Sequence, residues 1–421
     1  MQNIPFKRAL LPLACSLALY GCVGDESSSS SGGTTNTEDV STLCSSSDLY
    51  AVVCAANDFL DTLSSDEQVS LLLEWTDSSA KTVWSNLPGV TRNGLALGDL
   101  SEESLAAALA LAKVALSEEG YTDLTGVLAA DDYLNAYGSS GNAVAGSDES
   151  SDSSDSEESA ESETPPAPPE GDMTPPDGGM APPDGAGGGA TNSAYGAANY
   201  HIALLGVPSV DGDWMLQFGG HHMAYNITYR SGVVYPVPNH LGVEPKVAFE
   251  QDGETYSPML DEGAALVAMF AGLDENQLAA AYLSDEAYAD VLVGPDNGSG
   301  VLPTDYPIGS NRRGVLVSEL TQAQQALVRA AVLQWVGDYP ASVADPLMAD
   351  YFSAAALADT YIAWAGTESA GVDVDVSGTY MRIDGPRLWI EVACQSGVII
   401  QGQTHYHSVY RDKTMDYGDS L

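Results

Sequence analysis

The segment from residue 139 to residue 194 sets the strongest limit on the fold, because its composition is unsuited to a packed core. It contains the acidic serine run SDESSDSSDSEESAESE, followed by the Pro/Gly stretches MTPPDGG and MAPPDGA. Such a segment offers too little apolar surface to offset the entropy lost on ordering. We therefore predict a disordered insertion that serves as a spacer or, alternatively, as a weak calcium- or mineral-binding arm. The folded chain is then divided into residues 44–138 and residues 195–421.

Helix signals dominate the first folded part and recur in the second. Ser64 followed by Glu67 matches a capping box, and Thr321 followed by Gln324 matches another. The stretch from Leu105 to Leu116 repeats Ala and Leu at helical spacing. These patterns predict a mainly helical first part, residues 44–138, and further helices in the second.

Strand signals appear only after the insertion. Runs from His201 to Val207 and from Asp213 to Phe218 predict strands, as do Leu388 to Ala393 and Val398 to Ile400 near the C-terminus. Helices come first and strands last, without the βαβ rhythm of a doubly wound sheet. The predicted fold class is therefore α+β, with a helical N-terminal part packed against a mainly antiparallel sheet.

The N-terminus has the features of a bacterial lipoprotein signal. Lys7 and Arg8 precede a short apolar run, Ala9 to Tyr20, which is too short to span a membrane. The run ends in Leu-Tyr-Gly-Cys, which resembles a lipobox with Cys22 as the lipidated residue. We predict a signal peptide at residues 1–21 and a flexible tether at residues 22–43. A lipid anchor in the outer membrane of a Gram-negative cell envelope is expected, and an ordinary secretory peptide is the alternative.

Charge and cysteine usage restrict the partners and the compartment. The chain has 59 acidic and 14 basic residues, a net charge of −45, which disfavours binding to nucleic acid. Once the signal peptide and Cys22 are set aside, Cys44 and Cys54 form a natural disulfide pair for an oxidising compartment. Cys394 is left over, as a buried thiol or a soft metal ligand.

The histidines are the chemical signal of this sequence. All six lie between His201 and His407, and two of them form the pair H-x-H at His405 and His407. Residues two apart in a strand point to the same face, so this pair presents two imidazoles side by side. His221 and His222 would point to opposite faces of a straight strand, so one of them would join the site unless the preceding glycines kink the backbone. We predict a divalent metal site, with zinc, copper and iron equally compatible.

Charged residues near the H-x-H pair complete a candidate catalytic site. Glu391 is a plausible further ligand or general base. Arg382 and Arg411 stand out in a chain with few positive charges, and either could bind a carboxylate or phosphate. The alternative is structural: arginines near aspartates often form ion pairs that only support the fold.

Three longer motifs carry a family resemblance. W-x-x-QFGGHH (Trp214 to His222), RIDGPRLWIE (Arg382 to Glu391) and H-x-HSVYRD with the later DYG (His405 to Gly418) resemble the family known as domain of unknown function 3500. The stretches FLDTLSSDEQ and W-x-N-x-P are similar to its opening region. The resemblance implies that both folded parts belong to one domain interrupted by the insertion. It implies no established activity.

The sequence lacks the motifs of several common enzyme classes. No G-x-S-x-G elbow, P-loop, dinucleotide fingerprint, C-x-x-C or H-E-x-x-H is present. We expect a metal-dependent hydrolase or oxidoreductase acting on a small anionic or ester substrate. The alternative is a non-catalytic surface module that binds a metal, a ligand or a partner.

Overall fold

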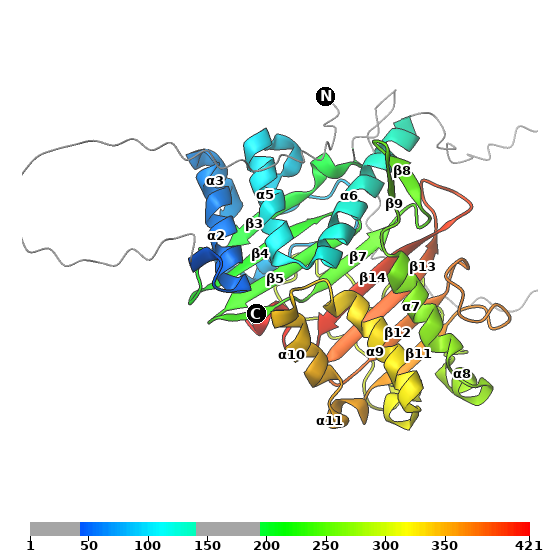
Figure 1. The fold of residues 1–421 in the computed structure, drawn as a ribbon. Helices are drawn as coiled ribbons and strands as arrows, with labels where there is room; N and C mark the ends of the chain where they lie inside the picture. Colours follow the sequence, from blue (N-terminus) through cyan, green and yellow to red (C-terminus); the bar gives the residue numbers. More distant parts are fainter. Residues whose placement is uncertain (1–42, 140–193) are drawn as a thin grey trace, which may run out of the picture.

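A large twisted sheet with helices on one face forms the centre of the protein (Figure 1). The computed structural model describes residues 43–139 and 194–421. The predicted signal peptide, Cys22, residues 22–42 of the tether and residues 140–193 of the insertion lie outside these ranges. Within the described residues, no helix is long and apolar enough to cross a membrane.

The elements alternate between helical and strand-rich stretches along the chain. The helices are α2 (Asp48–Asp61), α3 (Ser65–Leu71), α4 (Ser78–Lys81), α5 (Glu102–Ala115), α6 (Glu118–Ser139), α7 (Leu260–Ala271), α8 (Glu275–Ala281), α9 (Gln322–Val336), α10 (Ala341–Tyr351) and α11 (Ala354–Leu357). The strands are β1 (Leu72–Leu73), β2 (Leu95–Ala96), β3 (His201–Leu205), β4 (Asp213–Gly220), β5 (Met223–Arg230), β6 (Val233–Tyr235), β7 (Asn239–Val243), β8 (Phe249–Gln251), β9 (Glu254–Tyr256), β10 (Val315–Leu316), β11 (Tyr361–Ala365), β12 (Tyr380–Asp384), β13 (Leu388–Ser396) and β14 (Thr404–Asp412).

The predicted α+β class is confirmed. Twelve strands form one sheet in the order β1-β3-β4-β5-β7-β14-β13-β12-β11-β10, with β2 paired to β3 and β6 paired to β5. All pairings in this sheet are antiparallel except that of β1 with β3. Both predicted capping boxes are present, at Ser64 and at Thr321.

One predicted strand is absent and another is longer than predicted. Val398–Ile400 forms a loop rather than a strand, because the backbone amides of Ile399 and Ile400 donate to Glu244 Oε1 and not to a neighbouring strand. The strand predicted from Asp213 to Phe218 continues through Gly219 and Gly220, its last two residues, and the turn follows at the histidines.

The sheet has one apolar and one polar face. Leu216, Ile227, Leu241 and Ile390 share the face that packs against the helices, and all four are buried in the main core. Residues paired across neighbouring strands share a face. The pairing registers therefore place the alternate residues of these strands together on the other face. Its polar members are Gln217, Asn226, His240, His405, His407, Arg411, Glu391 and Arg382. Residues 74–94, which include the short helix α4, and residues 284–314 cover this polar face, for example where Gln217 Nε2 donates to Lys81 O.

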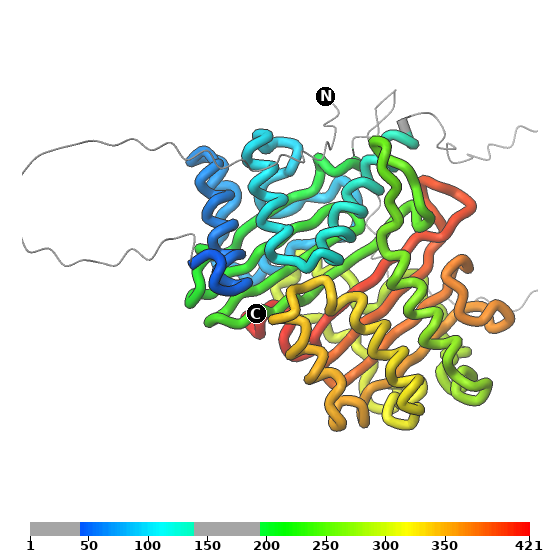
Figure 2. Tube along the Cα trace, in the orientation of Figure 1, coloured from blue at the N-terminus to red at the C-terminus, as the bar shows by residue number. Residues whose placement is uncertain are grey.

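The two halves of the sheet are structural repeats. In the first half α2, α3, β2 and α5 precede the strand series β3-β4-β5-β7, and in the second α7, α8, β10 and α9 precede β11-β12-β13-β14. Figure 2 shows the blue and cyan helices over the green strands, and the yellow and orange helices over the orange and red strands. β7 and β14, the last strands of the two halves, pair at the centre of the sheet. From this pair the order is β7-β5-β4-β3 on one side and β14-β13-β12-β11 on the other, so corresponding strands occupy corresponding positions.

Equivalent backbone contacts support the repeat. Leu97 N donates to Tyr200 O at 2.7 Å in the first half, and Val317 N donates to Thr360 O at 2.8 Å in the second. In both halves the donor residue is the first residue of a short 3₁₀ turn. This turn connects a two-residue strand to a long helix. The described parts on either side of the insertion therefore contribute to a single sheet and a shared core.

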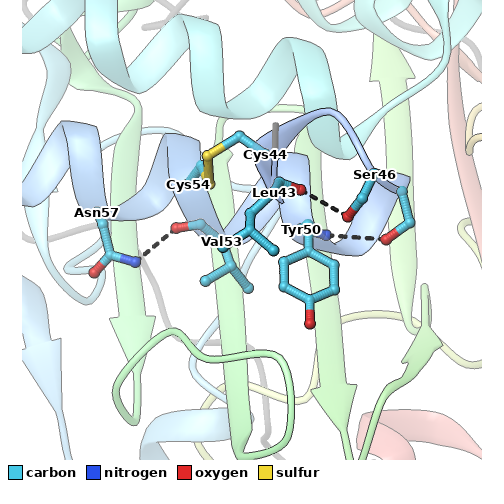
Figure 3. The surroundings of a disulfide bond; sticks show 8 residues. Leu43, Cys44, Ser46, Tyr50, Val53, Cys54 and Asn57 are labelled. Carbon is cyan, nitrogen blue, oxygen red and sulfur yellow. Dashed lines mark hydrogen bonds between the residues drawn. A yellow bond between two sulfur atoms is a disulfide. The ribbon is translucent and has the colours of Figure 1, made fainter. Parts of the chain in front are cut away.

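A disulfide links the first two cysteines of the described chain. Cys44 and Cys54 are joined with a Cα–Cα distance of 5.8 Å, and the bond fastens the segment before α2 to the middle of that helix (Figure 3). Cys394 is a free, buried thiol on β13. Burial raises the pKa of this thiol to about 12, so it is protonated and unreactive at neutral pH.

Candidate metal centre

His221 and His222 form the two-residue turn between β4 and β5. Gly220 pairs with Met223, so these two histidines alone close the hairpin. His222 has φ +64°, a left-handed conformation that histidine adopts more readily than most residues. Its amide donates to Asn86 O at 3.2 Å, and its carbonyl accepts from Gly242 N at 2.7 Å. The turn is thus fastened to the covering loop on one side and to β7 on the other.

His222, but not His221, is grouped with His405 and His407 as a possible metal ligand among the described residues, although both turn histidines belong to the cluster. Their rings stack with centroids 3.7 Å apart, because they occupy a turn rather than successive positions of a straight strand. His405 and His407 project from one face of β14, as predicted for an H-x-H pair, with centroids 4.9 Å apart. His222 lies 5.4 Å from the ring of His405 and 5.2 Å from that of His407.

Three of these imidazoles are close enough to share one ion. His222, His405 and His407 each offer a ring nitrogen, and these nitrogens all lie within 4.8 Å of one another. Gly242 makes this approach possible: a Cβ there would lie 2.5 Å from Tyr406 O and 3.3 Å from the Cδ2 atoms of His222 and His407. The donor set is purely imidazole, which suits zinc, copper or iron.

Carboxylates orient two of the imidazoles. His407 Nδ1 lies 2.8 Å from Asp290 Oδ1, and His221 Nδ1 lies 2.6 Å from Asp131 Oδ1. A carboxylate at Nδ1 leaves Nε2 of the same ring free for a metal, as is usual for metal-binding histidines. The amide of Asn86 also contacts His407 Nδ1, at 3.3 Å.

A family match agrees with the motifs. The family described as "Protein of unknown function (DUF3500)" matches residues 45–419. The chain belongs to this family. The match includes both described parts and the whole histidine cluster. Comparisons with curated proteins and with solved structures give no significant match.

His240 is a cluster member of this DUF3500 protein that sequence reasoning missed. It lies on β7, opposite Val409 of β14, and its ring centroid is 5.5 Å from that of His407. It is completely buried, and neither ring nitrogen has a hydrogen-bond partner among the described residues. The available signal was a histidine beside Leu241 and Val243 in a short strand-like stretch, where a buried polar side chain needs a partner. His201, the remaining histidine, instead contacts Asn199 O through Nδ1.

Burial keeps three of the cluster imidazoles, those of His222, His240 and His405, neutral. It lowers the pKa of His222 well below the ordinary value, and the neighbouring imidazoles lower it further. Burial also lowers the pKa of His240 to about 3 and, with the proximity of His407, that of His405 to about 4. These rings therefore carry a free lone pair at neutral pH, which is the form that binds metal.

The cluster lies just beneath the surface. Each of its five histidines is less than a tenth exposed. The Asp290 side chain beside His407, in contrast, is 44% exposed. Tyr195 packs edge-on against His221 with ring centroids 5.0 Å apart. Solvent thus reaches the carboxylate that holds His407, and the rings themselves are shielded.

The structure places Glu391 on the polar face of the sheet, opposite Val409 of β14, and gives it structural partners. Its carboxylate accepts hydrogen bonds from the amides of Leu292 and Val293, both at 2.7 Å, and from Tyr380 OH at 2.8 Å. These bonds hold the covering loop 284–314 against the sheet. Glu391 is therefore part of the scaffold rather than the general base expected from the sequence.

Arg411 is likewise a structural residue, whereas Arg382 is not fully paired. Arg411 is completely buried and binds Asp416 at 2.8 Å and Asp296 at 2.9 Å, so it cannot clamp a substrate. Arg382 lies opposite Glu391 on β12, and its Nη1 donates to Tyr288 OH at 3.1 Å. Its Nε and Nη2 are buried without a partner among the described residues.

Proposed function

We propose that this protein is a cell-envelope lipoprotein that binds a divalent transition-metal ion through His222, His405 and His407. The observation that carries the proposal is the convergence of three imidazole nitrogens, from a hairpin turn and a separate strand, within 4.8 Å. His405 Nδ1 and both ring nitrogens of His240 are buried without a hydrogen-bond partner among the described residues, which is unfavourable unless something satisfies them. A metal ion does so, and Asp290 orients His407 for it.

The donor set favours a catalytic type of site. Three protein ligands leave a position for water or substrate, whereas structural zinc sites are closed by four. An ion held in this way lowers the pKa of bound water and polarises an ester carbonyl, and copper or iron would add electron transfer. We propose hydrolysis or oxidation of a small anionic or ester substrate. Arg382, with two unpaired guanidinium nitrogens on the same face of the sheet, is the group best suited to attract an anion.

A second function, non-catalytic metal binding, is favoured by His240. Both of its nitrogens lack partners and its ring is next to His407, so it could supply a fourth ligand and close the site. Replacing bound metal by Co²⁺ distinguishes the two arrangements. If His240 coordinates, His240→Ala shifts the visible absorption of the Co²⁺ protein; if it does not, the spectrum stays unchanged.

The lipoprotein assignment rests on the N-terminal sequence. The lipobox-like Leu19 to Cys22 supports a lipid anchor, and the Cys44–Cys54 disulfide is typical of an oxidising compartment such as the periplasm or cell surface. Labelling with a radioactive fatty acid tests the anchor: incorporation that Cys22→Ala abolishes supports it, and label retained in that variant contradicts it.

The first test of the metal site is the metal content of the full chain by plasma mass spectrometry. We expect about one transition-metal ion per chain and its loss in the His405→Ala/His407→Ala double variant. His222→Asn is the sharper variant, because asparagine tolerates the left-handed backbone of the turn and removes only the imidazole. His201→Ala is the matched control, since His201 lies outside the cluster.

Equal metal content in these variants and in the wild type would contradict the site. So would a wild-type protein that takes up no zinc, copper or iron after reconstitution.

A further inference from the structure

Three carboxylates converge on the helical side of the sheet, away from the histidine cluster. Asp123 lies on α6, Glu262 on α7, and Asp338 follows the C-terminal end of α9. One oxygen from each lies within 4.8 Å of the others. Their exposures are 8%, 3% and 0%, so the group is almost entirely removed from solvent.

Glycines bring the three supporting elements into contact. A Cβ at Gly120 of α6 would lie 2.3 Å from Asp338 O, and one at Gly126 would lie 2.9 Å from the Pro258 ring that precedes α7. Ser117 N also donates to Asp338 O at 2.7 Å. The carboxylates are therefore held together by close backbone packing, which leaves them little freedom to separate.

The electrostatic surroundings of this group are unfavourable without a cation. Burial is the main cause that raises the pKa of Asp123 to about 7 and those of Glu262 and Asp338 well above their ordinary values. The charge of Asp123 also raises the pKa of Glu262 and of Asp338, Glu262 raises that of Asp338, and the nearby Glu119 and Asp261 add further negative charge. Buried carboxylates normally have a positive partner.

A second observation points to a ligand. Asp338 Oδ1 is buried and has no hydrogen-bond partner among the described residues. The other oxygen, Oδ2, has only a long contact of 3.5 Å with Tyr225 OH. A buried carboxyl oxygen in this position requires a donor or an ion.

A cavity of about 800 Å³ connects the group to solvent. Asp123 and Glu262 line it together with hydroxyl and further carboxyl groups, including those of Thr122, Ser257 and Asp261. The cavity gives an ion access, and water within it can complete the coordination shell.

We propose that Asp123, Glu262 and Asp338 form a calcium site that joins α6 and α7 to the end of α9. An all-oxygen donor set selects hard cations. Oxygens up to 4.8 Å apart fit around Ca²⁺, whose ligands lie about 2.3–2.6 Å from the ion. Mg²⁺ is less suitable, because it usually keeps several waters and takes one or two carboxylates. The site connects the two structural repeats and is independent of the histidine cluster.

The test is calcium binding to the full chain after treatment with a chelator. Isothermal titration with CaCl₂ is expected to show about one site per chain, and saturating Ca²⁺ is expected to raise the Tm by about 5 °C. Asp338→Asn and Glu262→Gln should each weaken binding at least tenfold and remove the Tm increase. Both substitutions also relieve repulsion, so the metal-free variants should unfold at or above the Tm of the metal-free wild type.

Controls separate this site from other effects. Asp345→Asn, at an exposed acid on α10, should leave Ca²⁺ binding unchanged. The His405→Ala/His407→Ala variant should keep the full calcium response even if it loses its transition metal. The proposal is overturned if Ca²⁺ binds the Asp338→Asn variant as tightly as the wild type, or if Mg²⁺ raises the Tm as much as Ca²⁺.

Discussion

At the scale of single residues, the sequence predicted those site residues that lie only a few positions apart in the chain. The H-x-H pair at His405 and His407 required only the two-residue period of a strand. His240, Asp290 and Asp131 could not be identified in this way, because they reach the cluster from segments far away in the chain. The role of Glu391 was hidden for a related reason: its main partners are backbone amides of an irregular loop, whose position no periodicity predicts.

Asp416 gives a prediction for the pH dependence of stability. Burial raises its pKa to about 7, although Arg411 at 2.8 Å favours the charged form. Asp296, the second carboxylate on Arg411, opposes ionisation of Asp416. Between about pH 4, the unfolded pKa, and pH 7, the folded state retains a proton that the unfolded state releases. The free energy of unfolding should therefore fall as the pH rises through this window, by roughly 1.4 kcal/mol per pH unit at most.

Urea unfolding of the wild type and of the Asp416→Asn variant between pH 4 and pH 8 measures this contribution. In the Asp416→Asn variant the free energy of unfolding should fall less steeply with pH than in the wild type. The Asp419→Asn variant, changed at an exposed neighbouring acid, should keep the pH dependence of the wild type. Parallel curves for wild type and Asp416→Asn would contradict the assignment.

At the scale of elements, the sequence indicated which segments are helical but not which of their acids are buried. Asp123 and Asp131 fall on the same stripe of α6 as Val127 and Leu134, at helical spacing. Glu262 is likewise four residues from Leu266 on α7. An acid on an apolar stripe is a detectable signal. In a chain with 59 acidic residues, however, it is easily attributed to the solvent-exposed face.

Glu391 provides a prediction at this scale, because it fastens a loop to a sheet. Glu391→Gln keeps the shape but places an amide NH₂ against the N–H donors of Leu292 and Val293. The free energy of unfolding should fall by about 1–3 kcal/mol, and the transition-metal content should stay unchanged. Urea unfolding measures the stability, and metal analysis measures the metal content. The control is Glu319→Gln, at an exposed position of the 3₁₀ turn Val317–Glu319. Unchanged stability together with loss of a detected activity would restore the catalytic role.

At the scale of the whole molecule, the fold is one domain built from two similar halves, and both proposed sites lie between them. His222 belongs to the first half and His405 and His407 to the second. Asp123 belongs to the first half, and Glu262 and Asp338 to the second. The α+β class followed from the order of helix and strand patterns. The repeat was not apparent, because the two halves share capping and strand positions more than residue identities.

This arrangement predicts the outcome of cutting the chain between residues 140 and 193. Strands β1 and β2 precede the cut and pair with β3 after it, and Asp131 before the cut accepts from Gly196 N at 2.8 Å. A protein with a specific protease site introduced in this segment should therefore remain assembled after cleavage. Its two fragments should co-elute in size-exclusion chromatography and separate only on a denaturing gel. Dissociation under native conditions would show that the two parts fold separately.

The ends of the sheet have a consequence for how this protein behaves at high local concentration. The strands beyond β3 on one side and β11 on the other, β1, β2 and β10, are each two residues long. A long free edge would offer unpaired amides and carbonyls to a strand of another chain and so promote polymerisation. These short strands leave little such template at either margin. Molecules present at high concentration are thereby protected from joining their sheets into fibres.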